Sequence, residues 1–563
     1  MAAGLGRWLT DAVLLAQVAW RQLREDPAWL FVQGTRQLPP RLRRLLRPGT
    51  GARPGVTSAL RALLADKPEQ ARELVVGHES RARFLGTQLG LEAPADDRVG
   101  MARVAAVRGE LSRAVAVGGG APVSRRAASE LRLLSPGFQL TPRPVAPPPH
   151  QHQTGNRRRV AMILNNSLPH TQSGYAQRTH SLLTAMRASG IEVEAWTRLG
   201  WPASVGRLGT DVLDVIDGVP YHRLPTPSFS AEHDRRWQQQ VDRLIPELAD
   251  FGPDVIHTTT DFHNGLVAQA AAASLGVPWV YELRGQIELS WAAQRPAPWR
   301  EQARSSERVR LARAKELELA RAADAVVVLS QVQADDLLDH GVEPRALRIA
   351  PNAVDEALLD HDIPAVEARR LVGLPVEGCW VGAVSSLNGY EGHDVLLRAV
   401  ALARREGQDI RCAIVGDGPA QPGLEALGSE LGLGDALVMP GRVPRRTALD
   451  WYAALDVFVV PRRDIPLCRV ITPMKPLEAM AMGRPVVASD LPALRTIIDG
   501  DAGVLVPAES SEELADALIS LAQDPATRTA LGRGAHAAAT ERTWAHNAAI
   551  CQSLYDGLVR DRP

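Results

Sequence analysis

The side chains best suited to chemistry lie in the stretch 461–489, between two apolar runs of the sequence. The loop that opens this stretch carries four cations, Arg462, Arg463, Arg469 and Lys475. A short helix is expected to start near Pro476, and Glu478 falls in its first turn, where the helix dipole favours a carboxylate that can face a sugar hydroxyl. A strand, a cationic loop and a helix start in this order are typical of a phosphate site at the carboxyl edge of a parallel sheet.

Two series of alternating strands and helices are expected to position this stretch. The first series predicts strands at 160–164, 191–196, 254–257, 277–281 and 325–329, with helices at 176–189, 264–275 and 304–322. The second predicts strands at 347–350, 380–385, 411–415, 436–439, 457–460 and 486–489, with a helix at 393–405. Such alternation is typical of an α/β fold with crossover helices on both sheet faces. Two such domains joined near residue 345 are expected to form a cleft between their carboxyl edges.

Residues 1–135 lie outside these series and are expected to form an all-helical module for oligomer, partner or membrane contact. The expected helices are 8–24, 58–64, 68–85 and 97–117. Residues 136–157 are expected to be a linker, because five prolines between Pro142 and Pro149 force an extended backbone.

The first helix has an apolar face that leaves two interpretations open. Leu9, Val13, Trp20 and Leu23 share this face, and the helix is too short to span a bilayer, which takes about 20 apolar residues. No cleavage signature follows it, so a secretory signal is not expected. The helix either lies at a membrane interface, helped by the basic residues that follow, or packs on its own domain or another subunit.

Composition excludes some classes of protein. The 563 residues have a formal net charge of zero, which gives no overall reason to expect a nucleic-acid partner. Four scattered cysteines form no C-x-x-C pair, which argues against a zinc site or a disulfide framework and suits a reducing cytoplasm. No Asp-x-Asp cluster occupies a loop after a predicted strand, so metal independence is expected and no cofactor is predicted.

From about residue 158 onward the chain carries a series of short motifs in this order: Ser173-Gly174-Tyr175, Arg284-Gly285, Pro351-Asn352-Ala353-Val354-Asp355, Tyr390-Glu391-Gly392, Gly416-Asp417-Gly418-Pro419, Gly441-Arg-Val-Pro444 and Lys475-Pro-Leu-Glu478. Their joint occurrence is a resemblance to the retaining GT-B glycosyltransferases, in particular glycosyltransferase family 4. It implies two Rossmann-like domains: an acceptor domain at 158–345 and a nucleotide-sugar domain at 346–540. The C-terminal helix, 541–563, is expected to pack back on the acceptor domain.

The resemblance also implies roles for individual residues. Glu478 matches the second carboxylate of the family's Glu-x7-Glu pair, which holds the ribose of the nucleotide, and Gly174 lets backbone amides approach a phosphate. The expected acceptor-binding residues are Tyr175 and His263. The expected catalytic residues are Arg284, Lys475 and Glu478. The expected donor-binding residues are Gly174, Ser385, Ser386, Glu391, Gly416, Arg442, Arg462, Arg463, Lys475 and Glu478.

The chain departs from the family pattern at three points. Val470 stands where the family's first glutamate would fall, with Asp464 the nearest acid in the loop. The family's phosphate-clamping Arg and Lys are absent from the loop 385–392. Because the loop has more cations than acids, the hypothesis is that Lys475, with Arg462 or Arg463, supplies the missing charge. Arg284 replaces a histidine found in many members, and an arginine cannot act as a base at neutral pH.

The sequence therefore predicts a cytoplasmic glycosyltransferase, soluble or peripheral at the inner membrane face. It would move a sugar from a nucleotide-sugar to an envelope lipid, a polysaccharide or a metabolite, with retention of configuration implied by the resemblance. The loss of the first glutamate leaves two alternatives open: a non-catalytic scaffold that binds sugar or nucleotide, and a nucleotide-sugar epimerase or hydrolase. The sugar, the base and the acceptor are not encoded in any readable motif.

Overall fold

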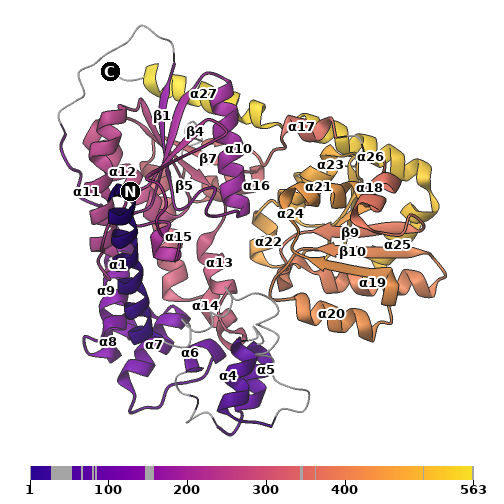
Figure 1. Cartoon of the computed structure of the whole chain (residues 1–563), viewed down its shortest axis with the longest axis horizontal. Helices are drawn as coiled ribbons and strands as arrows, with labels where there is room; N and C mark the ends of the chain where they lie inside the picture. The colour runs from indigo at the N-terminus through magenta and orange to yellow at the C-terminus, as the bar shows by residue number, and fades with distance from the viewer. Residues whose placement is uncertain are drawn as a thin grey trace. The chain divides into compact units, whose positions relative to one another are not determined.

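The structure, a computed structural model, describes residues 2–26, 53–64, 68–78, 82, 85–145, 157–342, 347–361, 363–498 and 500–560 (Figure 1). The chain divides into two compact units. The first comprises Met1–Val327, His340–Ala346 and Leu554–Pro563, and the second comprises Val328–Asp339 and Leu347–Ser553. Each unit is built on one sheet, as the two predicted α/β series require.

The first sheet has eight strands in the order β3-β4-β2-β1-β5-β6-β7-β8. Their bounds are β1 (Arg159–Leu164), β2 (Glu192–Thr197), β3 (Leu213–Ile216), β4 (Val219–His222), β5 (Val255–Thr259), β6 (Trp279–Leu283), β7 (Ala325–Val328) and β8 (Leu347–Ile349). Neighbouring pairs from β4 to β6 are parallel, and β3 pairs antiparallel with β4. The β3–β4 hairpin was not predicted. One expectation was wrong, because β8 is the edge strand of this sheet and does not open the second series.

Helices cover this sheet and meet its strands at polar loops. They are α10 (Gly174–Ala188), α11 (His233–Phe251), α12 (Phe262–Leu275), α13 (Ile287–Ala293), α14 (Arg300–Arg304) and α15 (Glu307–Ala322), whereas α16 (Gln331–Asp339) is part of the second unit. Every residue of β5 and β6 is buried. Both strands begin with apolar residues, which allowed the sequence to locate them, but they also bury polar side chains such as His257 and Glu282.

The N-terminal residues are helical as expected, with two corrections: the predicted helix 68–85 ends at Val75, and the predicted helix 97–117 is interrupted. The helices are α1 (Ala2–Glu25), α4 (Val56–Leu64), α5 (Pro68–Val75), α6 (Gly86–Leu89), α7 (Arg98–Arg108), α8 (Leu111–Gly118) and α9 (Pro122–Leu134). The predicted helix 97–117 is broken at Gly109, whose φ of +82° ends α7 in a left-handed cap. A side chain there would also collide with Ser306, so the break is fixed by packing against the start of α15.

The helical module is bound to the first unit rather than standing apart. Ser112 donates both its amide and its hydroxyl to Glu307, and Arg308 on α15 reaches Glu130 on α9 at 2.7 Å. The first part of the predicted linker is also packed, because Leu140 is buried and the Thr141 amide donates to Gln238 at 2.8 Å. The rest of that linker, 146–156, lies outside the described residues.

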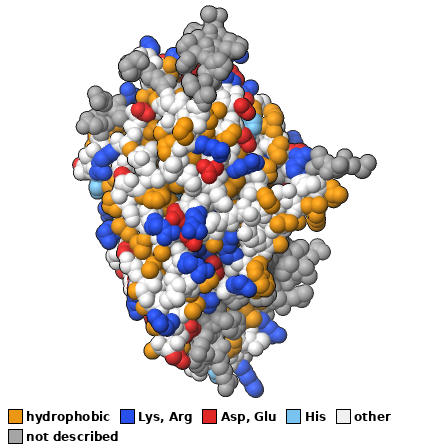
Figure 2. Space-filling model, turned by 90° about the vertical axis from the view of Figure 1, so that its left-hand side faces the viewer, with side chains coloured by type: hydrophobic (Ala, Val, Ile, Leu, Met, Phe, Trp, Pro, Cys, Tyr) orange, Lys and Arg blue, Asp and Glu red, His pale blue; other side chains and the backbone are white. Residues whose placement is uncertain are grey.

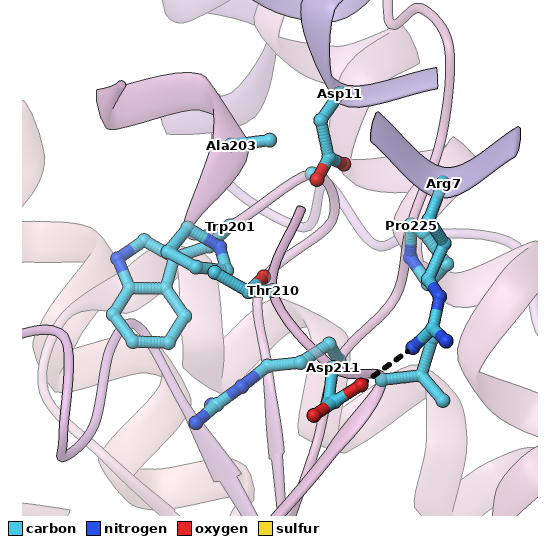
Figure 3. A pocket seen from close by; sticks show the side chains of 11 residues that line it. Arg7, Asp11, Trp201, Ala203, Thr210, Asp211 and Pro225 are labelled. Atoms are coloured by element: carbon cyan, nitrogen blue, oxygen red, sulfur yellow. Dashed lines mark hydrogen bonds and ion pairs between the residues drawn. The ribbon is translucent and has the colours of Figure 1, made fainter. Parts of the chain in front are cut away.

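Helix α1 packs on the first unit through one face. Leu14 is fully buried and meets Gly200, and the Arg7 guanidinium pairs with Asp211 at 3.0 Å across a shallow pocket (Figure 3). In the same pocket the buried Asp11 accepts from the Gly209 amide at 2.9 Å. None of the described helices is long and apolar enough to cross a bilayer. Figure 2 shows one face of the protein, with apolar side chains scattered among basic and acidic ones.

The second sheet has six strands in the order β11-β10-β9-β12-β13-β14. They are β9 (Cys379–Val384), β10 (Ile410–Val415), β11 (Leu437–Gly441), β12 (Val457–Val460), β13 (Val486–Ser489) and β14 (Gly503–Val506). Alternate residues of β12 face different cores: Val457 and Val459 pack with α19 (His393–Arg405) and α25 (Ser511–Gln523), whereas Phe458 and Val460 face α21 (Arg445–Ala454) and α23 (Lys475–Ala481). The sheet is therefore covered on both faces (Figure 1).

The remaining elements of the second unit complete its helical layers. They are α17 (Glu356–Leu359), α18 (Ala365–Val372), α20 (Gln421–Glu430), α22 (Pro466–Val470), α24 (Pro492–Arg495), α26 (Pro525–Thr540) and α27 (Trp544–Arg560). The end of α27 returns to the first unit: Asp556 pairs with Arg158 at 2.7 Å, and a 2.6 Å hydrogen bond joins the Tyr555 hydroxyl to His257 Nδ1.

The buried imidazole of His257 is expected to make the first unit sensitive to acid. His257 is fully buried, and burial lowers the pKa of its ring to about 4. A histidine in the unfolded chain titrates near 6.5, so folding favours the neutral ring, and that stability is lost as pH falls from about 6.5 toward 4. Between pH 7 and pH 5 the free energy of unfolding is expected to drop by about 2 kcal/mol from this group alone. Urea unfolding at both pH values measures the drop. A His257→Gln variant whose free energy of unfolding falls by as much between pH 7 and pH 5 would contradict the role of His257.

Candidate functional site

In the second unit, three loops at the carboxyl ends of β9, β10 and β12 pack backbone against backbone. A Cβ on Gly392 (φ +72°) would lie 1.8 Å from the Pro461 carbonyl oxygen, and one on Gly416 (φ +143°) would lie 1.8 Å from the Ser385 carbonyl oxygen. Only glycine permits both the left-handed backbone and this approach. The loops that carry the predicted site residues therefore meet at one edge of the sheet, where open α/β sheets bind ligands.

Glu478 lies in the first turn of α23, as the sequence predicted, and its carboxylate is held from α21. Arg445 Nη1 donates to Oε1 at 3.1 Å, and the Tyr452 hydroxyl donates to Oε2 at 2.7 Å. Burial and the nearby Glu478 charge raise the pKa of Tyr452 well above its usual value, so this hydroxyl stays a donor. Sequence reasoning missed Arg445 and Tyr452, because only the packing of α21 on α23 brings them to Glu478.

Arg462 does not offer the free charge that the sequence suggested. Its guanidinium is buried and donates to both carboxylate oxygens of Glu391, at 3.0 and 3.1 Å, and to the Ile471 carbonyl at 2.9 Å. Burial would raise the pKa of Glu391, but the attraction of Arg462 outweighs it and holds that pKa below its usual range. The pair therefore links the β9 and β12 loops, and the expected donor-binding role of both residues stays a prediction.

The other two arginines of the loop are also paired. Arg463 meets Asp394 at 2.6 Å and Glu509 at 3.6 Å, and its Nε donates to the Gly389 carbonyl. Arg469 forms a two-pronged pair with Asp464, so that acid is engaged by its own loop and does not stand in for the glutamate missing at Val470. The surplus of cations inferred from the loop sequence is thus largely neutralised.

Lys475 is the exception among the four cations. Its ammonium makes no ion pair or hydrogen bond within the described part of the chain, although it is half-buried at the start of α23. Its charge nevertheless acts on the site, because it helps to lower the pKa values of Glu391 and His393, after the effects of burial and of closer partners. Lys475 is therefore the one loop cation whose charge remains available to a ligand.

The remaining predicted donor-binding residues surround this edge. Ser385 Oγ and His393 Nε2 lie 2.8 Å apart, while the buried His393 Nδ1 has no partner in the described structure. The side chains of Ser386 and Arg442 are exposed. Asn352 donates to the Thr472 carbonyl at 2.8 Å and so anchors the loop that precedes Lys475. Among the described residues, no group of three or more His, Cys, Asp or Glu side chains is arranged to hold a metal ion.

In the first unit, the start of α10 is exposed but Arg284 is not. Gly174 and Tyr175 open α10 beside solvent, and a Cβ on Gly174 would meet nothing within 4 Å. Arg284 is only 2% exposed: it pairs with Glu282 at 2.6 Å and donates to Thr179 Oγ1 at 2.5 Å and to the Tyr175 carbonyl at 3.3 Å. The Arg284 side chain therefore supports α10 from inside the domain, and its expected catalytic role stays a prediction.

Glu282 is the centre of that internal network. Its carboxylate also accepts from Arg178 at 2.8 Å, and His257 Nε2 lies 3.6 Å away. Burial opposes ionisation of Glu282, but Arg284 and Arg178 outweigh it and hold the pKa of this carboxyl far below its usual range. The network fixes α10 to the sheet and so positions Gly174 and Tyr175.

His263, the second predicted acceptor-binding residue, lies at the carboxyl end of β5. Its ring stacks on Phe262 and Trp237, with centroids 3.9 and 4.8 Å apart, and its Nδ1 is 3.0 Å from Asp261 Oδ2. Trp237 comes from α11 and was not foreseen. The position at a strand end suits ligand contact, so the role of His263 stays a prediction.

Comparison with known proteins adds an independent finding. Residues 378–524 match the family described as "Glycosyl transferases group 1", and residues 173–353 match the "Glycosyl transferase 4-like domain". A D-inositol 3-phosphate glycosyltransferase from Acidothermus cellulolyticus is 30% identical over 427 residues, covering 72% of this chain and 91% of the relative. Two solved structures share the fold: sucrose-phosphate synthase from Thermosynechococcus elongatus (22% identity, TM-score 0.57, 72% and 100% of the two chains) and Anabaena HepE in complex with UDP (17%, 0.55, 71% and 100%).

Proposed function

The chain belongs to the group 1 glycosyl transferases, and from that premise we propose that it moves a sugar from a nucleotide-sugar to an acceptor, with retention of anomeric configuration. The observation that carries the proposal is Lys475, which makes no ion pair among the described residues and lies one helical turn before the fixed carboxylate of Glu478 at the carboxyl edge of the second sheet. The acceptor is proposed to be a hydroxyl of an envelope lipid, a polysaccharide or a metabolite.

Glu478 is suited to hold the ribose of the donor. A carboxylate offers about four acceptor positions, and Arg445 and Tyr452 occupy one on each oxygen. The remaining positions can accept hydrogen bonds from two vicinal hydroxyls. Because both oxygens are anchored from α21, the carboxylate is oriented before the nucleotide arrives, and less entropy is lost on binding.

Lys475 is suited to stabilise the departing diphosphate. Glycosyl transfer breaks the bond between the anomeric carbon and the phosphate oxygen, so negative charge grows on the leaving group. Lys475 would meet that charge, and the hydroxyls of Ser385 and Ser386 would donate to the same oxygens. The ion pair between Arg462 and Glu391 holds their two loops together and does not involve Lys475. We further propose that this arrangement works without a metal ion, so EDTA should leave transfer unchanged.

A Glu478→Gln substitution is expected to weaken donor binding at least tenfold, because a neutral amide is a weaker acceptor for ribose hydroxyls than a charged carboxylate. Isothermal titration with UDP, GDP and ADP as probes would measure the loss and show which base the site accepts. A Glu430→Gln variant at the exposed end of α20 is the control, and it should bind as the unmodified protein does.

Nucleotide release with a panel of nucleotide-sugars separates the transferase from its alternatives. Transfer predicts release that depends on an added acceptor. Release of free sugar without an acceptor would indicate a hydrolase, and binding without release would indicate a scaffold. Either of the last two outcomes would contradict the proposed activity.

The outward face of α1 favours a second proposal, that the protein binds an anionic membrane surface. The exposed apolar side chains on this face are Leu5, Trp8, Leu9, Val13, Trp20 and Leu23. Both acids of the helix, Asp11 and Glu25, are buried and engaged by the protein, so the outward face carries no carboxylate. The sequence that follows, 27–52, contains five arginines and no acid. An apolar stripe beside a basic segment is the pairing that anionic lipid attracts.

Sedimentation with phosphatidylcholine vesicles, with and without 30% phosphatidylglycerol, tests this proposal. The full chain is expected to bind the anionic vesicles, and a Leu9→Ser/Trp20→Ser variant should bind roughly tenfold more weakly, because two apolar anchors are lost. Leu371→Ser, which removes a similarly exposed residue from α18, should bind normally. Equal binding by all variants, or a self-associating protein that ignores vesicles, would contradict it.

A further inference from the structure

Two arginines from distant parts of the first unit lie over one aromatic ring, and a third follows a strand beside them. The guanidinium carbon of Arg236, on α11, lies 3.9 Å from the centroid of Phe229, and that of Arg21, on α1, lies 5.7 Å from it. The third, Arg198, directly follows β2. The amide of the next residue, Leu199, donates at 3.2 Å to Gln240, which lies one turn along α11 from Arg236.

This cluster has hydrogen-bond donors without acceptors. Within the described residues, the side chains of Arg198 and Arg236 make no ion pair and no hydrogen bond. Arg198 Nε is buried and unpaired, as are the Trp237 indole N–H and the Gln240 amide nitrogen, on residues that are 7% and 1% exposed. Three buried N–H groups in one place would ordinarily find partners, and unsatisfied buried donors cost free energy.

The charges around the cluster do not balance. Burial, followed by repulsion from Arg198, Arg21 and Arg126, lowers the pKa of Arg236 to about 9. Of the nearby acids, Glu25 is engaged with Arg126, and Asp261, which attracts Arg198, has Oδ2 3.0 Å from His263 and Oδ1 buried without a partner among the described residues. An arrangement of donors and unpaired guanidinium groups is complementary to an anion with several oxygens.

We propose that Arg198 and Arg236, with the Trp237 and Gln240 N–H groups, bind a phosphate group carried by the acceptor. The site lies at the carboxyl end of β2, next to β1 in the sheet, and the loop after β1 leads to Tyr175 at the start of α10. Open α/β sheets bind ligands at this edge. The proposal rests on the proposed transferase function, since it assigns the phosphate to the acceptor. The same phosphate chemistry occurs on a soluble phosphorylated acceptor and on a lipid headgroup.

Thermal unfolding of the full chain with inorganic phosphate tests the site without any transfer. At constant ionic strength, 20 mM phosphate is expected to raise the Tm by roughly 2–4 °C, because a ligand that binds only the folded state stabilises it. Arg198→Gln and Arg236→Gln should abolish this rise. Without phosphate, Arg236→Gln should raise the Tm, because a repelling buried cation is removed. A purely structural arginine would give the opposite sign.

Two controls keep the result specific. Arg235→Gln removes the neighbouring exposed arginine, 3.5 Å from Glu232, and should keep the full phosphate effect. Lys475→Ala removes the donor-site cation and should keep the part of the rise that depends on Arg236. A rise that persists in both Arg198→Gln and Arg236→Gln, or no rise in the unmodified protein, would overturn the site. A chain that shows the rise but transfers no sugar would keep the site and contradict only the transferase.

The source of the phosphate is decided by two further probes. A soluble acceptor is supported if glycerol 3-phosphate raises the Tm as much as inorganic phosphate does and if Arg236→Gln abolishes this rise. A lipid headgroup as the source of the phosphate is supported if vesicles of phosphatidylcholine with 20% phosphatidic acid bind the Arg236→Gln variant more weakly than the unmodified protein. If neither probe responds to Arg236→Gln, the phosphate does not belong to an acceptor, and the proposal fails.

Discussion

Lys475→Ala is expected to lower kcat/KM for the nucleotide-sugar by about a hundredfold to a thousandfold, with little change in the stability of the fold. A single preorganised charge or donor at a leaving group contributes about 3 kcal/mol to the transition state in a water-excluded site. Lys475 makes no ion pair among the described residues, so its removal leaves no buried partner uncompensated. The loss should appear mainly in kcat, because the charge it meets grows only as the bond to phosphate breaks.

Arg469→Ala is the matched control for this prediction. Arg469 lies six residues away in the same loop, carries the same charge, and is paired in solvent with Asp464. It should retain near-normal turnover. A Lys475→Arg variant should recover part of the rate, since charge is kept while reach and shape change. Near-normal turnover by Lys475→Ala would remove the lysine from the mechanism.

Glu282→Ala is expected to destabilise the first unit by about 3–5 kcal/mol, the cost of leaving buried charges without their partner. Arg178 and Arg284, each 2% exposed, would both lose the same carboxylate. Since the folded-state pKa of Glu282 lies below the unfolded value near 4.3, its contribution is fully present above that pH and is lost as pH falls further. Urea unfolding at pH 7 measures the effect.

Glu301→Ala is the control for this second prediction. Glu301 also pairs with an arginine, Arg304 at 3.1 Å, but its side chain is 87% exposed. Its removal should change the free energy of unfolding by less than about 1 kcal/mol. A Glu282→Ala protein that unfolds like the Glu301→Ala protein would show that the internal network does not hold α10 in place.

The sequence predicted those features that local pattern determines. The apolar runs at β12 and β13 and the helix at 393–405 were confirmed to the residue, because burial on both faces and an amphipathic repeat leave direct traces. Gly109 broke a predicted helix because its conformation depends on contact with Ser306, almost 200 positions away.

The site was harder to predict, because charge pairing is a tertiary property. From the loop alone, Arg462 looked like a free cation, yet its partner Glu391 lies 71 residues earlier. Arg445 and Tyr452 gave no signal, because they lie on a helix that lacks any motif. Arg284 directly follows strand β6, as predicted. Its hydrogen bond to Glu282, however, holds the Arg284 side chain inside the domain. Position in a motif could be predicted, whereas the availability of each side chain could not.

The return of α27 to the first unit has a consequence for how the chain is made. Tyr555 and Asp556 complete contacts with His257 and Arg158, residues that are synthesised about 300 and 400 positions earlier. The first unit therefore leaves the ribosome first, but its fold is complete only after the C-terminal helix has been synthesised. Until the final helix is released, His257 lacks its hydroxyl partner, and a fragment ending near residue 346 would remain permanently in that incomplete state.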